Sequence, residues 1–307
     1  MSMLKVGIIG ECMVELQQRD GELAQNFGGD TLNTAVYLSR LTQGEAMSIS
    51  YFTGLGQDFF SQEMLSTWQQ EGIDTQHVQV MEDRLPGLYA IEVDETGERS
   101  FHYWRNEAAA KFWLEQASQE LLNELSQFDV LYLSGISLAI LTEQSRQVLF
   151  DVLAKCKANG GKVVFDNNYR PRLWDSKVQA QQNYLKMLAL TDIGLLTFED
   201  EEALFGDSEI DQCLARSFEA GVTEVVIKRG AQECIIATQE SQISVPATLV
   251  EKVVDTTSAG DSFAAGYMAK RLLGGDASIA AQTGHRLAGI VIQHKGAIID
   301  KALMPQA

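Results

Sequence analysis

Short apolar runs alternate along the chain with amphipathic stretches of helical length. Short apolar runs are typical of strands buried on both faces, and the longer stretches predict helices. This order predicts an α/β fold, in which a mostly parallel sheet carries helices on both faces. The predicted strands are residues 6–9, 130–133, 163–165, 193–196 and 225–227, and the predicted helices are residues 31–41, 144–158, 177–190 and 210–220, with two more beginning near Ala259 and Ser278.

One stretch departs from this order and alternates with a period of two. Residues 88–93 and 99–105 flank the polar segment 94–98, which predicts an antiparallel hairpin with a turn at 94–98. Alternation places Tyr89, Ile91 and Val93 on one face of the first strand, and Phe101, Tyr103 and Arg105 on one face of the second. Such a hairpin in an α/β fold is a candidate lid, although a surface ribbon packed on the core has the same pattern.

The domain organisation is expected to be simple. No Pro/Gly/Ser-rich linker divides the 307 residues, of which four are prolines. We therefore expect a single domain over residues 1–307, with a small antiparallel β lid formed by inserted segments at roughly residues 11–18 and 75–106.

Charge narrows the range of partners. The chain has 42 acidic and 24 basic residues, a formal net charge of −18. This field repels phosphate backbones and anionic lipids, so we expect neither nucleic acid nor a membrane as a partner. A small anionic substrate would need arginines aimed at it locally. The acidic N-terminal segment lacks the features of a signal peptide, and the chain has no membrane-spanning apolar run, so a cytoplasmic location is expected.

The cysteines and histidines give no metal or disulfide pattern. Cys12, Cys156, Cys213 and Cys234 are scattered without C-x-x-C spacing, which favours reduced, buried thiols. The histidines lack the spacing of metal ligands. The sequence also has no P-loop, no G-x-G-x-x-G after a strand and no G-x-S-x-G, so these nucleotide and hydrolase motifs do not explain the chain.

The strongest local pattern is the segment 255–266, DTTSAGDSFAAG, in which small polar residues run directly into a predicted helix. Small residues let a ligand approach the backbone, and free N–H groups at a helix start bind anions. Asp261 would repel a bound phosphate unless it accepts a proton, which makes it a candidate general base for a hydroxyl attacking phosphorus. An ordinary N-cap explains the short Ala-Gly-Asp segment equally well.

These residues, and a second segment near the N-terminus, resemble the ribokinase-like (PfkB) family of carbohydrate kinases. Residues 255–266 resemble one signature of the family, with Ser258 where glycine is usual, and residues 28–41 (GGDTLNTAVYLSRL) resemble the other. The resemblance covers nearly the whole chain. It implies a ribokinase-like fold and a phosphotransferase that uses ATP and Mg²⁺.

The resemblance also implies roles for individual residues. Asp261 is the expected base, and the amides of Ala259 and Gly260 are the expected anion hole for the transferring phosphoryl group. The residues implied for the sugar hydroxyls are Gly28, Gly29, Asp30 and Asn33, and those implied for ATP are Asn168, Lys228, Arg229, Gly230, Ser258, Ala259 and Gly260.

The family's metal-associated N-x-x-E motif is altered in this chain. Its counterpart is the segment 197–200, Thr-Phe-Glu-Asp, with Thr197 in place of Asn and Asp200 in place of Glu. Asp200 is expected to hold Mg²⁺ through water, because Mg²⁺ keeps a shell rich in water. A solvated acidic first turn of a helix has the same pattern, and neighbouring carboxylates that are alternatives are Glu199, Glu201 and Glu202.

Within the family, the predicted lid and the segment 166–174 (DNNYRPRLW) resemble the kinases of the sugar acid 2-keto-3-deoxygluconate. Arg105 and Arg170, with the hydroxyls of Tyr89 and Tyr103, suit a substrate carboxylate, which binds best through charge-assisted hydrogen bonds. Neutral sugars do not need such a site. The resemblance thus implies ATP-dependent phosphorylation of the C6 hydroxyl of 2-keto-3-deoxy-D-gluconate.

Other interpretations of these patterns stay open. The substrate could be fructose, ribose or another keto-acid. The chain could instead be an inactive sugar-binding protein with a kinase fold, which the intact Asp261 disfavours, or a nicotinamide dehydrogenase, which the missing glycine motif disfavours. The exposed strand edges expected of a lid also predict a homo-oligomer formed through the lid.

Overall fold

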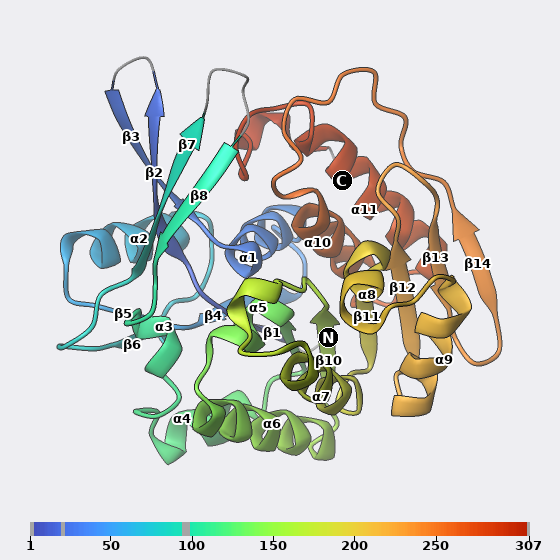
Figure 1. The fold of residues 1–307 in the computed structure, drawn as a ribbon, viewed down its shortest axis with the longest axis horizontal. Coiled ribbons are helices and arrows are strands. Elements are labelled where there is room, and N and C mark those ends of the chain that lie inside the picture. The colour runs from blue at the N-terminus through green and yellow to red at the C-terminus, as the bar shows by residue number, and fades with distance from the viewer. Residues whose placement is uncertain (1–2, 20–21, 94–98, 306–307) are drawn as a thin grey trace.

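An eight-stranded sheet forms the centre of the protein in the computed structural model, which describes residues 3–19, 22–93 and 99–305 (Figure 1). Neighbouring strands from β4 to β12 are parallel, and β13 and β14 are added antiparallel at one edge. The predicted α/β fold is confirmed. In spatial order the strands are β14 (Gln242–Val245), β13 (Cys234–Ala237), β12 (Glu224–Lys228), β11 (Ile193–Thr197), β10 (Lys162–Asp166), β9 (Val130–Ser134), β1 (Leu4–Ile9) and β4 (Met47–Phe52).

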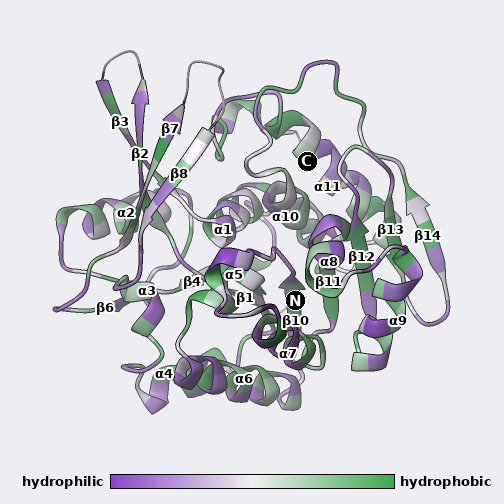
Figure 2. Cartoon of the chain, viewed as in Figure 1, coloured by the Kyte–Doolittle hydropathy of each residue, from purple (hydrophilic) through white to green (hydrophobic). Residues whose placement is uncertain are grey.

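Helices cover both faces of this sheet, because its strands are apolar on both sides (Figure 2). In β10, Val164 packs in the core shared with α1 and α10, whereas Val163 and Phe165 pack in the core shared with α6 and α7. The helices are α1 (Asp30–Leu41), α2 (Phe59–Gln70), α3 (Ala109–Phe112), α4 (Gln119–Leu125), α5 (Gly135–Ile140), α6 (Glu143–Ala158), α7 (Lys177–Leu188), α8 (Phe198–Phe205), α9 (Ile210–Ala220), α10 (Ala259–Arg271) and α11 (Ala277–Val291), with 3₁₀ turns at Pro171–Leu173 and Lys301–Leu303.

Every strand and helix predicted from the apolar pattern is present, with boundaries that shift by one or two residues. The parallel connections need helical crossovers, and these are the predicted amphipathic segments. The described cysteines are free and buried, as expected. Among the residues that the structure describes, no helix has the length and apolar character to cross a membrane.

The predicted hairpin forms half of a second, four-stranded sheet, which we call the lid. Its strands lie in the order β3 (Glu22–Gly28), β2 (Met13–Arg19), β7 (Gly87–Val93) and β8 (Arg99–Trp104), and a separate short sheet pairs β5 (Gly54–Leu55) with β6 (Gln79–Val80). Tyr89 lies opposite Tyr103 and Ile91 opposite Phe101, which confirms the predicted face. The predicted turn at 94–98 lies outside the described residues.

Two details of the lid differ from the prediction. Its two hairpins are antiparallel, but β2 and β7 join them through a parallel pairing. Residues 22–28 also belong to the lid, whereas residues 75–86 lie outside its strands. The sequence missed β3 because most of its residues are exposed and it has no apolar alternation, so backbone pairing with β2 alone makes it a strand.

Candidate active site

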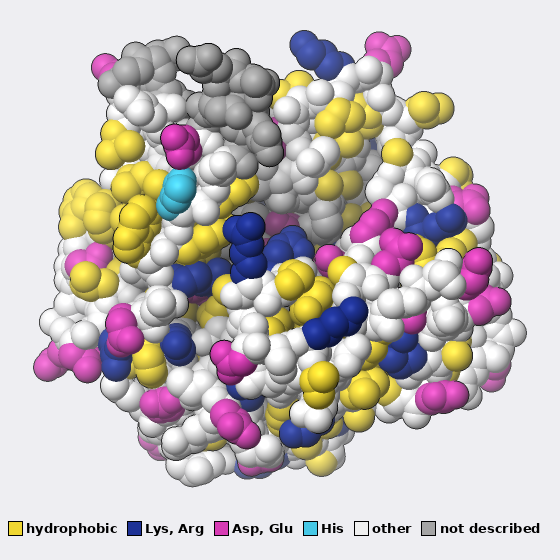
Figure 3. Space-filling model, viewed as in Figure 1, with side chains coloured by type: hydrophobic (Ala, Val, Ile, Leu, Met, Phe, Trp, Pro, Cys, Tyr) yellow, Lys and Arg dark blue, Asp and Glu magenta, His cyan; other side chains and the backbone are white. Residues whose placement is uncertain are grey.

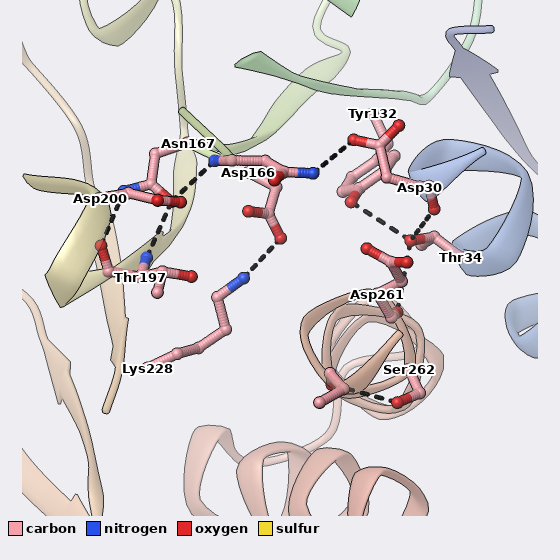
Figure 4. Close-up of polar contacts among 12 residues, drawn as sticks. Asp30, Thr34, Tyr132, Asp166, Asn167, Thr197, Asp200, Lys228, Asp261 and Ser262 are labelled. Carbon is pink, nitrogen blue, oxygen red and sulfur yellow. Dashed lines mark hydrogen bonds and ion pairs between the residues drawn. The ribbon is translucent and has the colours of Figure 1, made fainter. Parts of the chain in front are cut away.

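Three aspartates and a lysine converge where the carboxyl ends of the parallel strands meet the first turns of α1 and α10 (Figure 4). Asp166 ends β10, Lys228 ends β12, Asp30 begins α1 and Asp261 lies in the first turn of α10. Ligands of open α/β sheets bind at this edge, because the loops leave a crevice there. This edge is therefore the candidate active site.

Asp261 is buried, and the other predicted signature segment supplies its hydrogen-bond donor. Its Oδ2 accepts a 2.8 Å hydrogen bond from the side-chain amide of Asn33. Burial raises the pKa of Asp261 well above its ordinary value, the charge of Asp30 adds to the shift, and the hydrogen bond from Asn33 opposes it. A carboxylate with a raised pKa is a stronger base, which suits the removal of a proton from a hydroxyl.

The start of α10 leaves open space beside Gly260. A Cβ added there would have one neighbour within 4 Å outside its own helix, the Nζ atom of Lys228 at 3.6 Å. The N–H of Ala259 donates to the carbonyl of Thr256 at 3.2 Å, so of the two expected donors Gly260 is the more accessible. An anion at this helix start would therefore meet first the N–H of Gly260 and the ammonium of Lys228.

A cavity of about 550 Å³ opens beside this helix start and brings together most of the residues predicted to bind ATP. Those that line it are Lys228, Arg229, Gly230, Ala259 and Gly260. Ser258 does not line the cavity: its side chain is buried, and its hydroxyl donates to the carbonyl of Ala297 at 2.5 Å. Asn168 does not line the cavity either, and its side-chain amide donates to Asp30 at 2.6 Å.

The sequence analysis missed the apolar part of this cavity. It is formed by the segment before α10 and by one face of α11, neither of which carries a motif. Its lining residues there are Ala247, Thr248, Leu249, Val250, Val253, His285, Ala288, Gly289 and Ile292. An apolar slot that continues from an anion site has the shape and chemistry for a nucleoside with its phosphates.

The lid places its aromatic face next to the double glycine. The rings of Tyr89 and Tyr103 are tilted against each other, with centroids 5.7 Å apart, and the hydroxyl of Tyr89 donates to Glu15 on β2. A Cβ on Gly28 would lie 2.1 Å from the Tyr89 hydroxyl oxygen, so a side chain at this position would displace the tyrosine. A Cβ on Gly29 would lie equally close to the backbone carbonyl of Glu11. Close approach to rigid backbone thus requires glycine at position 29, whereas at position 28 it keeps Tyr89 in its place.

Arg105 follows β8 and is held by a buried acid that the sequence analysis did not identify. Its Nη2 donates to Glu11, whose side chain is only 2% exposed. Burial raises the pKa of Glu11, and the adjacent Arg105 opposes that shift. The Nε of Arg105 is buried and has no hydrogen-bond partner among the described residues. An arginine with a donor left over beneath the lid is suited to hold an anionic group of a ligand.

Arg170 lies in the segment after β10 and is half exposed. Its Nη1 is 3.6 Å from Oδ1 of Asp200. The other carboxylate oxygen of Asp200 accepts a hydrogen bond of 3.1 Å from the N–H of Tyr169. Burial raises the pKa of Asp200 to about 6, although Arg170 opposes the shift. Figure 3 shows lysine and arginine side chains gathered at the hollow beside the lid. Local positive charge of this kind is what a small anionic substrate would need in an acidic protein.

The acidic segment at the start of α8 has a donor set that fits Mg²⁺. Asp200 and Glu199 offer carboxylate oxygens beside the nucleotide cavity, and Glu199 lines it. Glu201 is excluded, because its buried carboxylate bonds Asn167 at 2.9 Å and Arg216 at 2.6 Å. Mg²⁺ prefers oxygen ligands and retains water, so Asp200 fits the expected role of holding it through water.

Comparisons with known proteins agree with this architecture. Solved structures similar to the chain include a fructokinase from Vibrio cholerae O395 in a form with fructose, ADP and calcium bound, with TM-score 0.82, 27% identity and coverage of 97% of this chain and 95% of the other. A putative ribokinase II from E. coli in complex with ATP and Mg²⁺ has TM-score 0.82 and 25% identity, covering 96% and 94% of the two chains.

Similarity to curated proteins is higher. The chain is 55% identical over 305 residues to the 2-dehydro-3-deoxygluconokinase of Escherichia coli strain K12, covering 98% of this chain and 99% of that protein. It is 45% identical over 305 residues to the enzyme of the same name from Haemophilus influenzae, covering 97% and 96%. The model of the pfkB family of carbohydrate kinases matches residues 3–303, and the chain belongs to that family.

Proposed function

We propose that the protein is an ATP-dependent kinase that phosphorylates the C6 hydroxyl of 2-keto-3-deoxy-D-gluconate (2-dehydro-3-deoxygluconate). The observation that carries this proposal is the 55% identity, over 98% of the chain, to enzymes named 2-dehydro-3-deoxygluconokinase. The geometry is consistent with it, because a buried base lies between a nucleotide cavity and a lid that carries a buried arginine.

Asp261 is the proposed catalytic base. Its carboxylate accepts the proton of the C6 hydroxyl while the hydroxyl oxygen forms a bond to the γ-phosphorus of ATP. The bond between that phosphorus and the β–γ bridging oxygen breaks, and ADP leaves. Charge on the transferring phosphoryl group is stabilised by the amides of Ala259 and Gly260 at the start of α10 and by the ammonium of Lys228.

The two ends of the sugar acid are held by different parts of the site. We assign the carboxylate to Arg105 and Arg170, together with the hydroxyls of Tyr89 and Tyr103 on the lid. The unpartnered Nε of Arg105 supports this assignment, because a buried donor without an acceptor is costly until a ligand supplies one. The sugar hydroxyls are assigned to Gly28, Gly29, Asp30 and Asn33.

We assign Asp200 to hold Mg²⁺ through water molecules. When bound, it supplies positive charge that neutralises the phosphates of ATP. Asp200 would orient that water, and the hydrogen bond that it accepts from the N–H of Tyr169 fixes the position of its carboxylate.

A panel of sugars and sugar acids, each assayed with ATP and ranked by kcat/KM, tests the proposed function. We expect 2-keto-3-deoxygluconate to rank first, and mass spectrometry to place the phosphate on C6. Preference for fructose or ribose would reject the substrate and leave the kinase assignment in place, since fructokinases are relatives at 30–32% identity. Absence of ADP release with every sugar would reject the kinase assignment.

We also propose that the protein forms a homo-oligomer through the lid. The edge strands β3 and β8 have unpaired backbone groups, and apolar side chains on and beside them are exposed, including Trp104 at 62% and Leu23 at 68%. A groove of about 590 Å³ beside β8 is lined by Phe60, Leu85 and Trp104 among others. An apolar surface of this kind is covered most simply by a second copy of the same sheet.

Sedimentation velocity tests this assembly. The wild type should sediment as a dimer or a larger closed oligomer, and Trp104→Lys as a smaller species. Val178→Lys on α7, which is 60% exposed and far from the lid strands in sequence, is the matched control and should sediment like the wild type. A monomeric wild type at micromolar concentration would reject the proposal.

The proposed use of ATP and the buried, free cysteines support a cytoplasmic location.

A further inference from the structure

An ion pair links two strand ends within the candidate site. The Nζ of Lys228 on β12 donates to Oδ2 of Asp166 on β10 at 2.6 Å, and β11 lies between these strands (Figure 4). Both side chains are less than a tenth exposed. They meet because each comes two residues after a valine, Val164 or Val226, that packs in the core on the α1 and α10 side of the sheet.

The pair fixes where the ammonium lies relative to the start of α10. The Nζ of Lys228 is 3.6 Å from the position of a Cβ on Gly260. An ammonium has three N–H donors, so the contact with Asp166 leaves two for a further acceptor. Asp166 itself is buried, and its pKa is raised by burial and lowered by Lys228.

Lys228 supplies positive charge beside Asp261, where the other titratable groups are mainly acidic. The groups that face Asp261 are Asp30 and Tyr37 from α1, Tyr132 from β9, Asp166 from β10 and Lys228 from β12. Four of these groups are carboxylates, which disfavour an approaching phosphate, or buried phenols, which offer it no charge. The ammonium is therefore the group that can compensate a phosphoryl charge at this point.

We propose that Asp166 is a positioning residue of the reaction, which holds the Lys228 ammonium at the start of α10 so that Lys228 binds the transferring phosphoryl group. This inference rests on the proposed kinase function and adds to it a residue that acts through Lys228 and does not itself touch the substrate. A free lysine at a strand end would rotate among many rotamers, and the buried carboxylate restricts it to one direction.

The chain offers a matched control on the same strand. Glu224 begins β12 and bonds Arg271 of α10 at 2.6 Å, with the glutamate buried and the arginine one-third exposed. This pair joins the same strand and the same helix that carry Lys228 and Gly260, but at the opposite ends of both. It shares the packing role of the first pair and lies away from the site.

A double-mutant cycle over Asp166→Asn, Lys228→Met and the double variant tests the proposal. We expect each single variant to lower kcat about 10²–10³-fold, the effect of removing one preorganised charge. The KM for the sugar should change by less than about threefold, because the losses are confined to the phosphate end. The double variant should lose no more activity than Lys228→Met alone, since Asp166 acts through Lys228.

Thermal unfolding of the same variants separates positioning from structural support. Removing one partner of a buried pair leaves an unpaired charge, so each single variant should unfold at a lower temperature, and the double variant should recover. Activity should not recover with it. In the control cycle, Glu224→Gln, Arg271→Met and their double variant should repeat the stability pattern with kcat unchanged within about twofold.

Two outcomes would overturn the inference. One is a double variant whose kcat returns together with its stability, which would make the pair structural. The other is additive loss of kcat in the cycle, which would give Asp166 a role of its own. The same cycle can be measured without turnover, by calorimetry of the binding of a non-hydrolysable ATP analogue to each variant. The two failures are then distinguishable: an inactive wild type would reject the proposed function, whereas additive losses of analogue affinity would reject only the role of Asp166.

Discussion

The edge of the main sheet and the lid contribute to one site in different ways. At the sheet edge, Asp166, Lys228 and Asp261 are almost fully buried, and each is bonded to a residue of another element. On the lid, Tyr103 is 51% and Trp104 is 62% exposed. Buried charges that bond to other elements are held in one position and act strongly, whereas exposed side chains on a small sheet can vary without disturbing the core.

This difference suggests a division of labour. Under the proposed function, the sheet edge would carry out phosphoryl transfer and the lid would select the sugar. A fructokinase structure that shares the fold at 27% identity fits this view, because the sugar bound in it, fructose, is neutral. Variants at the edge should therefore affect every substrate equally, and variants on the lid side should affect sugar acids selectively.

The largest expected effect is at Gly260. Gly260→Val should abolish detectable turnover on every sugar, because the side chain fills the space that the phosphoryl group needs. The fold should be retained, since a Cβ there meets only the flexible end of Lys228 at 3.6 Å. Steady-state assays and thermal unfolding check this together. Retained activity would show that no phosphate binds at the start of α10.

The next effect is at Asp261. Asp261→Asn should lower kcat by roughly 10²–10⁴-fold, the usual value of positioned general base catalysis, with ATP and sugar binding within a few-fold. Burial raises the pKa of this carboxyl, so loss of its charge should not lower the unfolding temperature. Calorimetric binding and kcat measurements check both parts. A variant with wild-type turnover would remove Asp261 from the role of base.

A smaller and selective effect is expected for the arginines. Arg105→Ala or Arg170→Ala should cost roughly 10–150-fold in kcat/KM for 2-keto-3-deoxygluconate, from about 1.5–3 kcal/mol per hydrogen bond to a charged group. A neutral ketose should lose much less, because it has no carboxylate. Arg105 tests the lid directly, because it follows β8, whereas Arg170 follows β10 and lies 3.6 Å from Asp200. Equal losses on both substrates would contradict the division between edge and lid.

The smallest effect concerns stability and pH at Asp200. Its pKa rises from 3.8 in the ordinary case to about 6 in the folded protein, so the folded state binds the proton more tightly. Stability should therefore fall as pH rises from about 4 to 6, by on the order of 2–3 kcal/mol. Asp200→Asn should remove this dependence and unfold at a higher temperature than the wild type at pH 7, but not at pH 4.

Thermal unfolding at several pH values measures this difference. Asp151→Asn, at an exposed position on α6, is the control and should follow the wild type throughout. An Asp200→Asn variant that is less stable than the wild type at pH 7 would contradict the assignment, because it would mean that the charged carboxylate stabilises the fold.

The sequence by itself determined the alternating layers and the residues at the start of α10. Apolar runs such as 163–165 and 193–196 leave few alternatives to buried parallel strands, since both faces must be covered. The free amides and small residues at the starts of α1 and α10 are local features, because they depend only on the residues at each helix start. The resemblance to a family then supplied roles for Asp261, Arg105 and Arg170.

Only the tertiary structure decided which distant residues share a contact. The pairing of Glu11 with Arg105, of Glu15 with Tyr89 and of Asp166 with Lys228 joins segments that nothing local connects. The strand β3 and the apolar wall of the nucleotide cavity likewise have no pattern of their own. These contacts depend on the register of neighbouring strands, on the crossover connections and on the face of the strand that each side chain occupies. All three are set by the assembly of the whole sheet, which a single segment does not specify.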